Sequence, residues 1–150
     1  MKYISKSIKQ TGDLAKDLAK NLRGGEVLAL IGELGAGKTT FTQSLAKALG
    51  VKDRVTSPTF VVMKVYKTKH QTIKNLVHID AYRLGEAIDL SNIGWTDFQD
   101  KNSVVVIEWA DKVAKQLGKE TIYLKFVLAR AGGRIIEVNN FHKKPATKTK

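Results

Sequence analysis

Cysteine is absent from this chain, and so are apolar runs of membrane-spanning length. Without cysteine among its 150 residues, it can form no disulfide bond, cysteine-based zinc finger or cysteine nucleophile. No apolar run approaches the roughly 20 residues that a transmembrane helix needs. The first residues, Met1 to Lys6, lack the apolar core of a signal peptide. These absences predict a cytoplasmic protein that does not contact a membrane.

Acidic residues are scarce relative to basic ones. The chain has 26 lysines and arginines against 14 aspartates and glutamates, which gives a formal net charge of +12. Such a charge favours a polyanionic partner such as tRNA, or an acidic protein. Lysine-rich surfaces also keep proteins soluble, and nucleotide sites are themselves basic, so the charge alone leaves both interpretations open.

Length and composition suit one domain with an adequate core. Hydrophobic residues make up 43% of the chain and charged residues 27%, which is typical of a globular fold rather than a disordered segment. We expect this domain to span residues 1–140. Residues 141–150 are polar and include four lysines, so they are predicted to form a basic, flexible tail.

The sequence also contains a phosphate-binding motif, since residues 32–39 match the pattern G-x-x-x-x-G-K-S/T at every fixed position. Glycine allows the tight turn that aims successive backbone N–H groups at phosphate oxygens. The N–H groups expected to do so belong to Gly35, Ala36 and Gly37. Lys38 is predicted to place its ammonium between the β- and γ-phosphates of a nucleotide, and Thr39 to give its hydroxyl to Mg²⁺.

The residues on either side of this loop predict a strand before it and a helix after it, which is the arrangement that phosphate binding requires. Residues 26–31 are mostly apolar and predict a buried strand that leads into the loop. After the loop, Phe41, Leu45 and Leu49 recur every four residues, which predicts a helix that ends at Gly50. A strand, a glycine loop and a helix in this order place the partial positive charge of the helix N-terminus at the phosphates.

The remaining pattern predicts alternating strands and helices. Strands are expected at residues 3–8, 60–66, 76–79, 104–107, 122–128 and 134–138, and short helices at residues 13–22, 89–98 and 110–117. Strands 60–66 and 76–79 are predicted to form one hairpin, and the last two strands another. The resulting fold class is α/β: a three-layer sandwich like that of P-loop NTPases, with a mixed, mostly parallel sheet and antiparallel hairpins.

Two acidic residues stand at the ends of apolar strands. Asp80 follows strand 76–79, and Glu108 follows strand 104–107. Ligands collect at the carboxyl ends of parallel strands, so these carboxylates are candidates for the metal and for the attacking water of a nucleotide hydrolase. Because an aspartate has a low ordinary pKa, Asp80 suits orienting water better than abstracting its proton. Helix capping or lysine pairing is the alternative for each acid, and which of them dominates at the metal stays open.

A hydroxyl-rich segment follows the loop helix. Thr56, Ser57 and Thr59 flank the rigid Pro58, in the connection that reaches the γ-phosphate and Mg²⁺ in switch-type P-loop proteins. An ordinary turn explains the same residues.

Taken together, four segments resemble the TsaE family, formerly called YjeE, of small bacterial ATPases needed to make N6-threonylcarbamoyladenosine in tRNA. The matching segments are residues 32–40, 56–60, 78–84 and 106–111. Their order and spacing agree with the family, and the resemblance extends to about Val138. Only the first segment is common to many other proteins.

The resemblance implies a role for individual residues. Lys38 would hold phosphates, Thr40 would contact the α-phosphate side, and Thr39 and Glu108 would ligate Mg²⁺. Loss of Asp80 would abolish hydrolysis. Trp109 would lie near the nucleotide, and Thr59 would respond to the γ-phosphate. The cofactors implied are therefore ATP and Mg²⁺.

The resemblance also implies how the base and the partner proteins are bound. The family holds adenine with the N-terminal segment and the last hairpin, where Thr11 and Arg134 are candidates, although both also suit a solvated surface. Family members are weak ATPases alone, and they reset the TsaB–TsaD transferase rather than transfer the group themselves. Tyr82 and Arg83 would lie near that interface, but Arg83 could equally pair with Glu86. A contact with tRNA could accompany this role.

Three other classes of protein fit the residues less well. A P-loop kinase of small molecules needs an acceptor pocket and usually an arginine-bearing lid, whereas the chain has five arginines and no insertion of lid length. A GTPase would contain Asn-Lys-x-Asp and Asp-x-x-Gly, and neither occurs. A non-catalytic RNA-binding module would show a recognisable motif or an aromatic platform, which we do not find.

Overall fold

The computed structural model describes residues 1–58, 62–84 and 89–142, except for the side chain of Arg83. Its strands are β1 (Lys2–Ser5), β2 (Val27–Gly32), β3 (Met63–Lys67), β4 (Asn75–Asp80), β5 (Ser103–Glu108), β6 (Ile122–Leu128) and β7 (Arg134–Asn139). Its α-helices are α1 (Ile8–Ala19) and α2 (Lys38–Ala48), and its 3-10 helices are η1 (Ala81–Arg83), η2 (Leu90–Ile93), η3 (Trp95–Phe98) and η4 (Ala110–Gln116).

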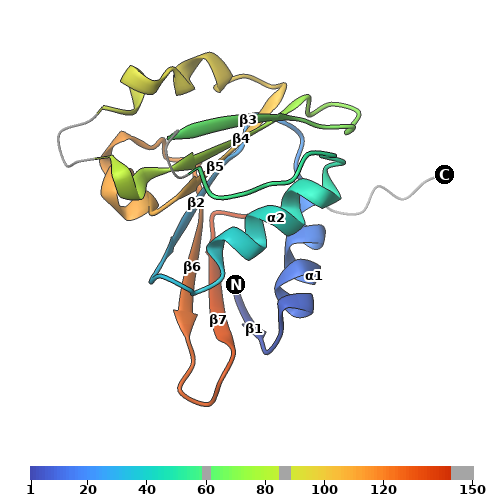
Figure 1. Cartoon of the computed structure of the whole chain (residues 1–150), viewed down its shortest axis with the longest axis vertical. Coiled ribbons are helices and arrows are strands. Elements are labelled where there is room, and N and C mark those ends of the chain that lie inside the picture. Colours follow the sequence, from blue (N-terminus) through green and yellow to red (C-terminus); the bar gives the residue numbers. More distant parts are fainter. Residues whose placement is uncertain (59–61, 85–88, 143–150) are drawn as a thin grey trace.

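The strands form one mixed sheet in the order β1-β7-β6-β2-β5-β4-β3 (Figure 1). In its centre β2 pairs in parallel with both β5 and β6, and β4 pairs in parallel with β5. Antiparallel pairs flank this centre on both sides, with the predicted hairpins β3–β4 and β6–β7 among them. The predicted α/β class with a mixed sheet is therefore confirmed.

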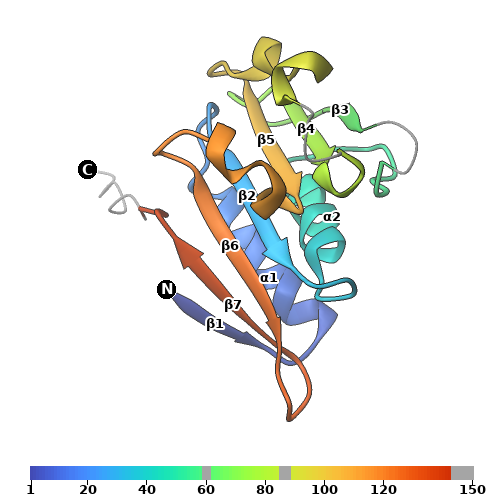
Figure 2. The same cartoon turned by 90° about the vertical axis from the view of Figure 1, so that its left-hand side faces the viewer.

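Helices cover both faces of the sheet, with α1 and α2 behind it in the view of Figure 2. The core on their side includes Leu18, Phe41 and Leu45, whereas the core on the opposite side includes Trp95 and the apolar residues of η4. The segments predicted as short helices on this opposite face are 3-10 helices. Gly94, with a φ of 81°, separates η2 from η3, because a left-handed residue cannot continue either helix.

The N-terminal prediction was wrong in its boundaries. The predicted strand 3–8 ends at Ser5, and α1 begins at Ile8 rather than at residue 13. The reason is the cap: the hydroxyl of Ser7 accepts a hydrogen bond from the backbone N–H of Gln10 at 3.1 Å, which satisfies one of the free amides at the helix start. Of the predicted strand 60–66, residues 60 and 61 lie outside the described residues, and β3 begins at Met63.

The parallel strands bring three chemically important points to one edge of the sheet. Strand β2 runs directly into the phosphate-binding loop, while β4 ends at Asp80 and β5 at Glu108. Asp80 and Glu108 are also register partners across β4 and β5. Their carboxylates are therefore held on neighbouring strands beside the loop, as expected for the carboxyl ends of parallel strands.

Candidate nucleotide-binding site

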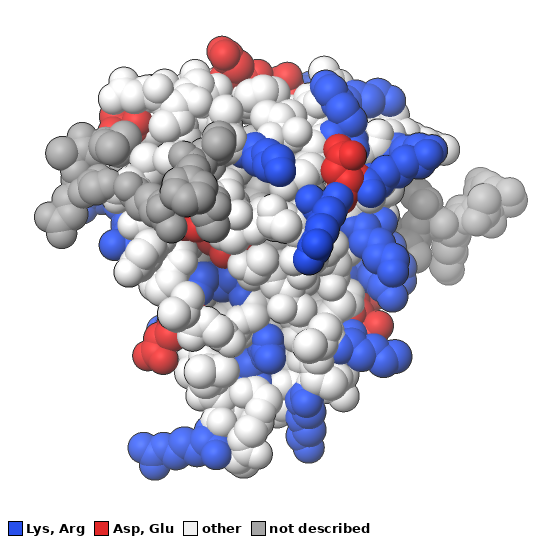
Figure 3. Space-filling model, in the orientation of Figure 1, with Lys and Arg blue, Asp and Glu red and all other residues white. Residues whose placement is uncertain are grey.

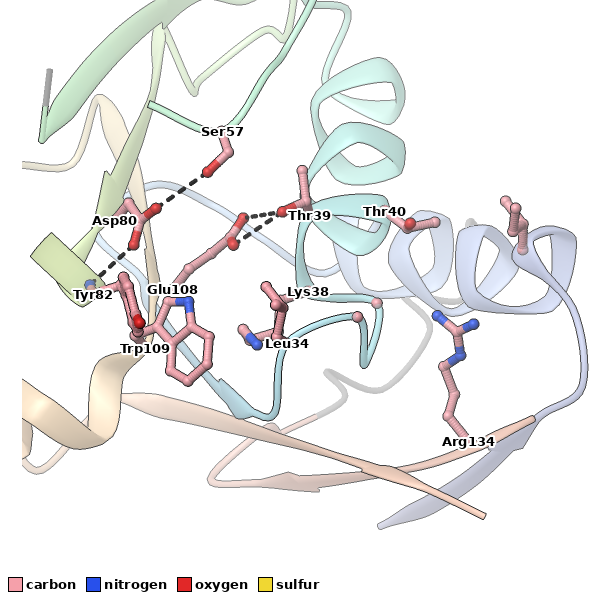
Figure 4. Close-up of a pocket in the computed structure, with 13 residues that line it drawn as sticks. Leu34, Lys38, Thr39, Thr40, Ser57, Asp80, Tyr82, Glu108, Trp109 and Arg134 are labelled. Atoms are coloured by element: carbon pink, nitrogen blue, oxygen red, sulfur yellow. Dashed lines mark hydrogen bonds between the residues drawn. The ribbon is translucent and has the colours of Figure 1, made fainter. Parts of the chain in front are cut away.

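A pocket of about 540 Å³ opens at this edge of the sheet (Figure 4). Its walls come from the loop and the start of α2, from the ends of β4 and β5, and from the start of β7. The lining residues are Ile8, Leu34, Gly35, Gly37, Lys38, Thr39, Thr40, Ser57, Asp80, Tyr82, Glu108, Trp109 and Arg134. Figure 4 shows Asp80 and Glu108 toward one end of this pocket and Arg134 toward the other.

The loop adopts a conformation that favours glycine at two of its positions. Gly35 and Gly37 have φ angles of 77° and 105°, in the left-handed region that side-chain-bearing residues rarely adopt. Among the described residues, no side chain caps the N-terminus of α2, where Gly37 is the N-cap residue. The first amides of this helix are thus left to an anion in the pocket.

Replacing Gly37 by alanine is expected to destabilise the fold. A left-handed conformation costs a residue with a Cβ about 1–2 kcal/mol, which corresponds to a decrease in Tm of about 2–8 °C for a chain of this size. The new Cβ would also collide with the guanidinium of Arg134. Thermal unfolding by circular dichroism measures the effect. Gly118→Ala is the control, because its Cβ would meet no atom of the described residues within 4 Å. Equal Tm values for the two variants would contradict the prediction.

The ammonium of Lys38 is folded into the loop. Its Nζ donates hydrogen bonds to the carbonyl oxygens of Gly32 and Glu33, at 2.5 and 2.9 Å, and lies 4.1 Å from the centre of the Trp109 ring. Burial lowers the pKa of Lys38 below its ordinary value, and the nearby carboxylates, Glu108 first, act in the opposite direction. The side chain is thus a desolvated cation in the pocket, where it can attract phosphate more strongly than in water.

The carboxylate of Glu108 faces the start of α2. Thr39 donates its hydroxyl proton toward Oε1 and Oε2, at 3.1 and 3.0 Å. His78 contacts Oε1 from the core, with 2.8 Å between Nε2 and that oxygen. Glu108 is only 3% exposed, so its charge is held in place by these neighbours rather than by solvent.

Asp80 is held by partners that aim its carboxylate into the pocket. One oxygen accepts a hydrogen bond from the hydroxyl of Ser57 at 3.1 Å, and the other from the backbone N–H of Tyr82 at 3.0 Å. The Tyr82 ring packs on Trp109 with 4.9 Å between ring centres. Trp109 itself has a φ of 57°, a strained value for a bulky residue, of the kind that clusters at functional sites.

Of the predicted site residues, most line the pocket, but some do not. Gly35, Gly37, Lys38, Thr39, Thr40, Ser57, Asp80, Tyr82, Glu108, Trp109 and Arg134 do. Ala36 is buried beneath the loop, and Thr56 is exposed but does not line the pocket. Thr59 and the side chain of Arg83 lie outside the described residues.

Thr11 is not placed to bind adenine in this structure. Its side chain is fully buried, and its hydroxyl lies 2.8 Å from that of Ser5. The physical reason is the early start of α1, which turns Thr11 toward the inner face of the helix instead of leaving it in an open segment. The expectation for Thr11 is therefore corrected.

Sequence reasoning missed two residues of this region. Ile8 is 69% exposed and lines the pocket from the first position of α1; the spacing of Ser7 and Gln10, which resembles a capping box, could have indicated this helix start. His78 is fully buried beside Glu108. Its only signal in the sequence was one polar side chain within the otherwise apolar predicted strand 76–79.

The oxygen atoms near Thr39 suit a magnesium ion. Mg²⁺ is usually bound by one or two carboxylates together with hydroxyl, water and phosphate oxygens, and Thr39 and Glu108 supply a hydroxyl and a carboxylate side by side. Within residues 1–58, 62–84 and 89–142, no group of three or more histidines and acids forms an all-protein metal site. The donor set therefore fits a metal that shares its coordination with a nucleotide.

The fold and the loop define a P-loop protein, and comparison with known proteins narrows the class. The family model for TsaE, the threonylcarbamoyl adenosine biosynthesis protein, matches residues 5–136. This chain belongs to the TsaE family. In the described part of the chain, no helix has the length and apolar character needed to cross a membrane.

Individual relatives agree with this assignment. The chain is 35% identical to the tRNA threonylcarbamoyladenosine biosynthesis protein TsaE of Treponema pallidum, over 92% of this chain and 99% of that protein. It is 36% identical to TsaE of Bacillus subtilis, over 88% of this chain and 79% of that one. The crystal structure of Bacillus subtilis YdiB superposes with a TM-score of 0.70 and 32% identity, covering 91% of this chain and 82% of that one.

Proposed function

We propose that this chain binds ATP and hydrolyses it with Mg²⁺, as a nucleotide-driven subunit of the machinery that makes threonylcarbamoyladenosine in tRNA. The observation that carries the proposal is one pocket in which Lys38, Thr39, Glu108 and Asp80 converge on the end of the phosphate-binding loop. Membership of the TsaE family supports the tRNA pathway. ATP is preferred to GTP because the guanine-reading motif Asn-Lys-x-Asp is absent from the sequence.

Each side chain at the phosphate end has a distinct task in this proposal. Lys38 leaves the loop carbonyls and binds the β- and γ-phosphates. Thr39 and Glu108 would hold Mg²⁺, which neutralises charge on the phosphate oxygens when bound. Asp80, already oriented by Ser57 and the Tyr82 amide, accepts a hydrogen bond from the attacking water and aligns it with the γ-phosphate.

The base belongs at the other end of the pocket. Thr40 and Arg134 line that end, and Ile8, which also lines the pocket, follows β1, where Ser5 is the register partner of Arg134. The Nε atom of Arg134 is buried without a hydrogen-bond partner among the described residues. Its flat guanidinium can stack on adenine, and the exposed Ile8 side chain offers an apolar contact. We expect Arg134 and Ile8 to contact the adenosine portion of ATP.

ATP affinity is expected to decrease with rising pH, and the decrease should begin at a lower pH than the ordinary pKa of lysine would give. Burial lowers the pKa of Lys38 below 10.5, and phosphate binding needs its protonated form. Affinity is therefore present at pH values below the lowered pKa and decreases above it, by up to about tenfold per pH unit. Titrations with a fluorescent ATP analogue across this range test the prediction. Lys38→Arg is the control, since arginine keeps its charge; parallel decreases in both proteins would contradict it.

The mouth of the pocket suits a partner protein. Leu34 is 85% exposed and Tyr82 is 58% exposed, and both line the pocket, Leu34 from the phosphate-binding loop and Tyr82 from η1. A protein that covers them would sense whether the pocket holds a γ-phosphate. We propose that this partner is the TsaB–TsaD complex and that the chain acts in the cytoplasm.

The proposal is tested by measuring ATP and GTP hydrolysis by the purified chain, with and without TsaB–TsaD. ATP turnover that is low alone and rises with the partners supports it. Substantial ATP turnover that does not change when TsaB–TsaD is added would contradict the proposed role of the chain in the cycle of that complex. Tight ATP binding without turnover in either condition would contradict the ATPase and favour a kinase or a nucleotide sensor.

A further inference from the structure

His78 approaches Glu108 from inside the protein. It lies on β4, two residues before Asp80, and its side chain is fully buried. The 2.8 Å contact from Nε2 to Oε1 of Glu108 requires the ring proton on Nε2, because a carboxylate only accepts hydrogen bonds. Within the described residues the other ring nitrogen, Nδ1, is buried without a partner, so this tautomer leaves no buried N–H unsatisfied.

The contact restricts how the Glu108 carboxylate can turn. His78 holds Oε1 from the core side, and the Thr42 hydroxyl lies 3.5 Å from the same oxygen. The Thr39 hydroxyl lies 3.1 Å from Oε1 and 3.0 Å from Oε2, so holding Oε1 in place also keeps Oε2 beside Thr39. Without a donor at position 78, the carboxylate could rotate away from Thr39.

We propose that His78 is a positioning residue, whose Nε2–H orients the Glu108 carboxylate toward Thr39 for binding of the nucleotide's Mg²⁺. This inference rests on the proposed function. Hydrogen-bond partners of metal ligands typically change metal affinity by about 10- to 100-fold when removed. The contribution is expected in metal binding rather than in nucleotide binding itself.

Two variants separate positioning from packing. His78→Leu replaces the ring by an apolar side chain of similar size and so removes the hydrogen-bond donor. His78→Gln keeps an N–H donor at the end of the side chain. The Mg²⁺ concentration for half-maximal binding of a fluorescent ATP analogue is expected to rise about 10- to 100-fold in His78→Leu and only a few-fold in His78→Gln. Binding of the analogue in EDTA should match the native protein in both variants.

A second measurement does not depend on nucleotide. Histidine NMR of the full native chain is expected to show a protonated Nε2 on His78, with a signal that shifts in Glu108→Gln. An unchanged Mg²⁺ requirement in His78→Leu, equal losses in both His78 variants, or a proton on Nδ1 alone would overturn the inference. If the native chain itself binds no ATP analogue in the presence of Mg²⁺, the proposed function fails. That failure is seen without any variant, so it is distinct from a failure of the inference about His78, which requires a native chain that binds the analogue.

An independent observation concerns the far end of α2 from the loop. One groove is lined by Lys16 of α1, Lys20 at its C-terminal cap, Lys47 of α2 and His70. A second groove is lined by Lys47, Lys52 and Arg54. The backbone N–H of Lys69 donates to the carbonyl of Leu49 at 3.2 Å, which places Lys69 beside them. We call Lys16, Lys20, Lys47, Lys52, Arg54 and Lys69 the basic surface.

The positive charge of the basic surface is largely uncompensated. Lys20 pairs with Asp17 at 3.0 Å, and Asp53 also lines the second groove. The other five cations of this surface have no carboxylate within ion-pair distance in the described part of the chain. Contact with the Lys52 amine lowers the pKa of Lys69, as expected when two ammonium groups lie close together. Figure 3 shows lysines and arginines gathered on the side of the molecule where α1 and α2 lie.

We infer that the basic surface binds the phosphate backbone of RNA. Adjoining grooves whose lysines, apart from Lys20, have no ion pair in the described part of the chain suit a chain of phosphates, and relatives at 35–36% identity are named for the modification of tRNA. The surface lies about 15 Å from the phosphate-binding loop along the axis of α2, so RNA there would leave the nucleotide pocket open.

Charge reversal with a matched control tests this inference on the complete chain. Lys16, Lys47 and Lys69 are changed together to glutamate, and the control changes Lys115, Lys119 and Lys125, which are exposed and belong to η4, its following turn and β6. Binding of labelled tRNA is followed by fluorescence anisotropy at several salt concentrations. The first triple variant is expected to bind at least about 100-fold more weakly and to lower the slope of log affinity against log salt by about 2–3. The control should stay within about threefold of the native protein.

Equal losses in the two triple variants would overturn the inference, because total charge rather than this surface would then bind tRNA. Competition by polyglutamate at the same charge concentration as tRNA would overturn it too, in favour of an acidic protein partner. Circular dichroism and binding of the ATP analogue should be native-like in both variants, which keeps a folding defect from imitating the result.

Discussion

Lys38→Ala is expected to weaken ATP binding by at least about 30-fold, which is the low end of the cost of removing one partner of a buried charge pair, about 2–5 kcal/mol. Lys38 is 4% exposed, and its ammonium is held at the loop by two carbonyls. The other cation that lines the described pocket, Arg134, lies toward the opposite end from Asp80 and Glu108, so we do not expect it to replace Lys38 at the β- and γ-phosphates. Isothermal titration with a non-hydrolysable ATP analogue measures the loss.

A matched variant keeps this result specific. Lys115→Ala removes a lysine from the exposed surface of η4 and should bind the analogue like the native protein. Native-like affinity in Lys38→Ala would remove the loop lysine from the proposed site and, with it, the main support for nucleotide binding there.

Asp80→Asn is expected to keep ATP bound and to lower turnover by about 10²- to 10⁴-fold, the range typical of a positioned acid–base group. Asparagine preserves the shape of the side chain and can still contact Ser57 and the Tyr82 amide, but it lacks the charge that attracts the proton of the attacking water. Single-turnover hydrolysis, together with affinity for the ATP analogue, separates chemistry from binding.

The exposed Asp97 of η3 supplies the control for this experiment, since Asp97→Asn changes the same charge away from the pocket. Full turnover in Asp80→Asn would mean that another residue orients the attacking water, and Glu108 would be the next candidate. A shift in the Mg²⁺ requirement without a loss of maximal turnover would instead make Asp80 a metal-binding residue. The effect of Asp80→Asn thus distinguishes a role of Asp80 at the attacking water from a role at the metal.

The phosphate-binding loop was predictable because its chemistry is local. Gly37, Lys38 and Thr39 are neighbours in the chain, so their spacing alone defines the turn and the helix start. Asp80 and Glu108 were predictable for a less local reason: each ends an apolar strand, and parallel strands align their carboxyl ends. Their pairing across β4 and β5 confirms that expectation.

The contact between His78 and Glu108 could not be predicted in the same way. It links residues 30 positions apart through the register of two strands, and a one-residue shift would turn His78 to the opposite face. The contact between Ser5 and Thr11 was also missed. The sequence pattern favoured a strand that continues to residue 8, whereas the Ser7 cap starts α1 at Ile8 and so brings Thr11 onto the helix face beside Ser5.

The sequence by itself determined the class of this protein, the phosphate-binding loop and the positions of the two acids at strand ends, because these depend on short motifs and on the alternation of apolar strands with helices. Only the tertiary structure decided that Thr11 is buried, that Ile8 and Arg134 share the far end of the pocket, and that His78 holds Glu108. Those arrangements depend on the pairing of β1 with β7 and of β4 with β5. Such contacts are set by the packing of distant segments, and no local pattern encodes them.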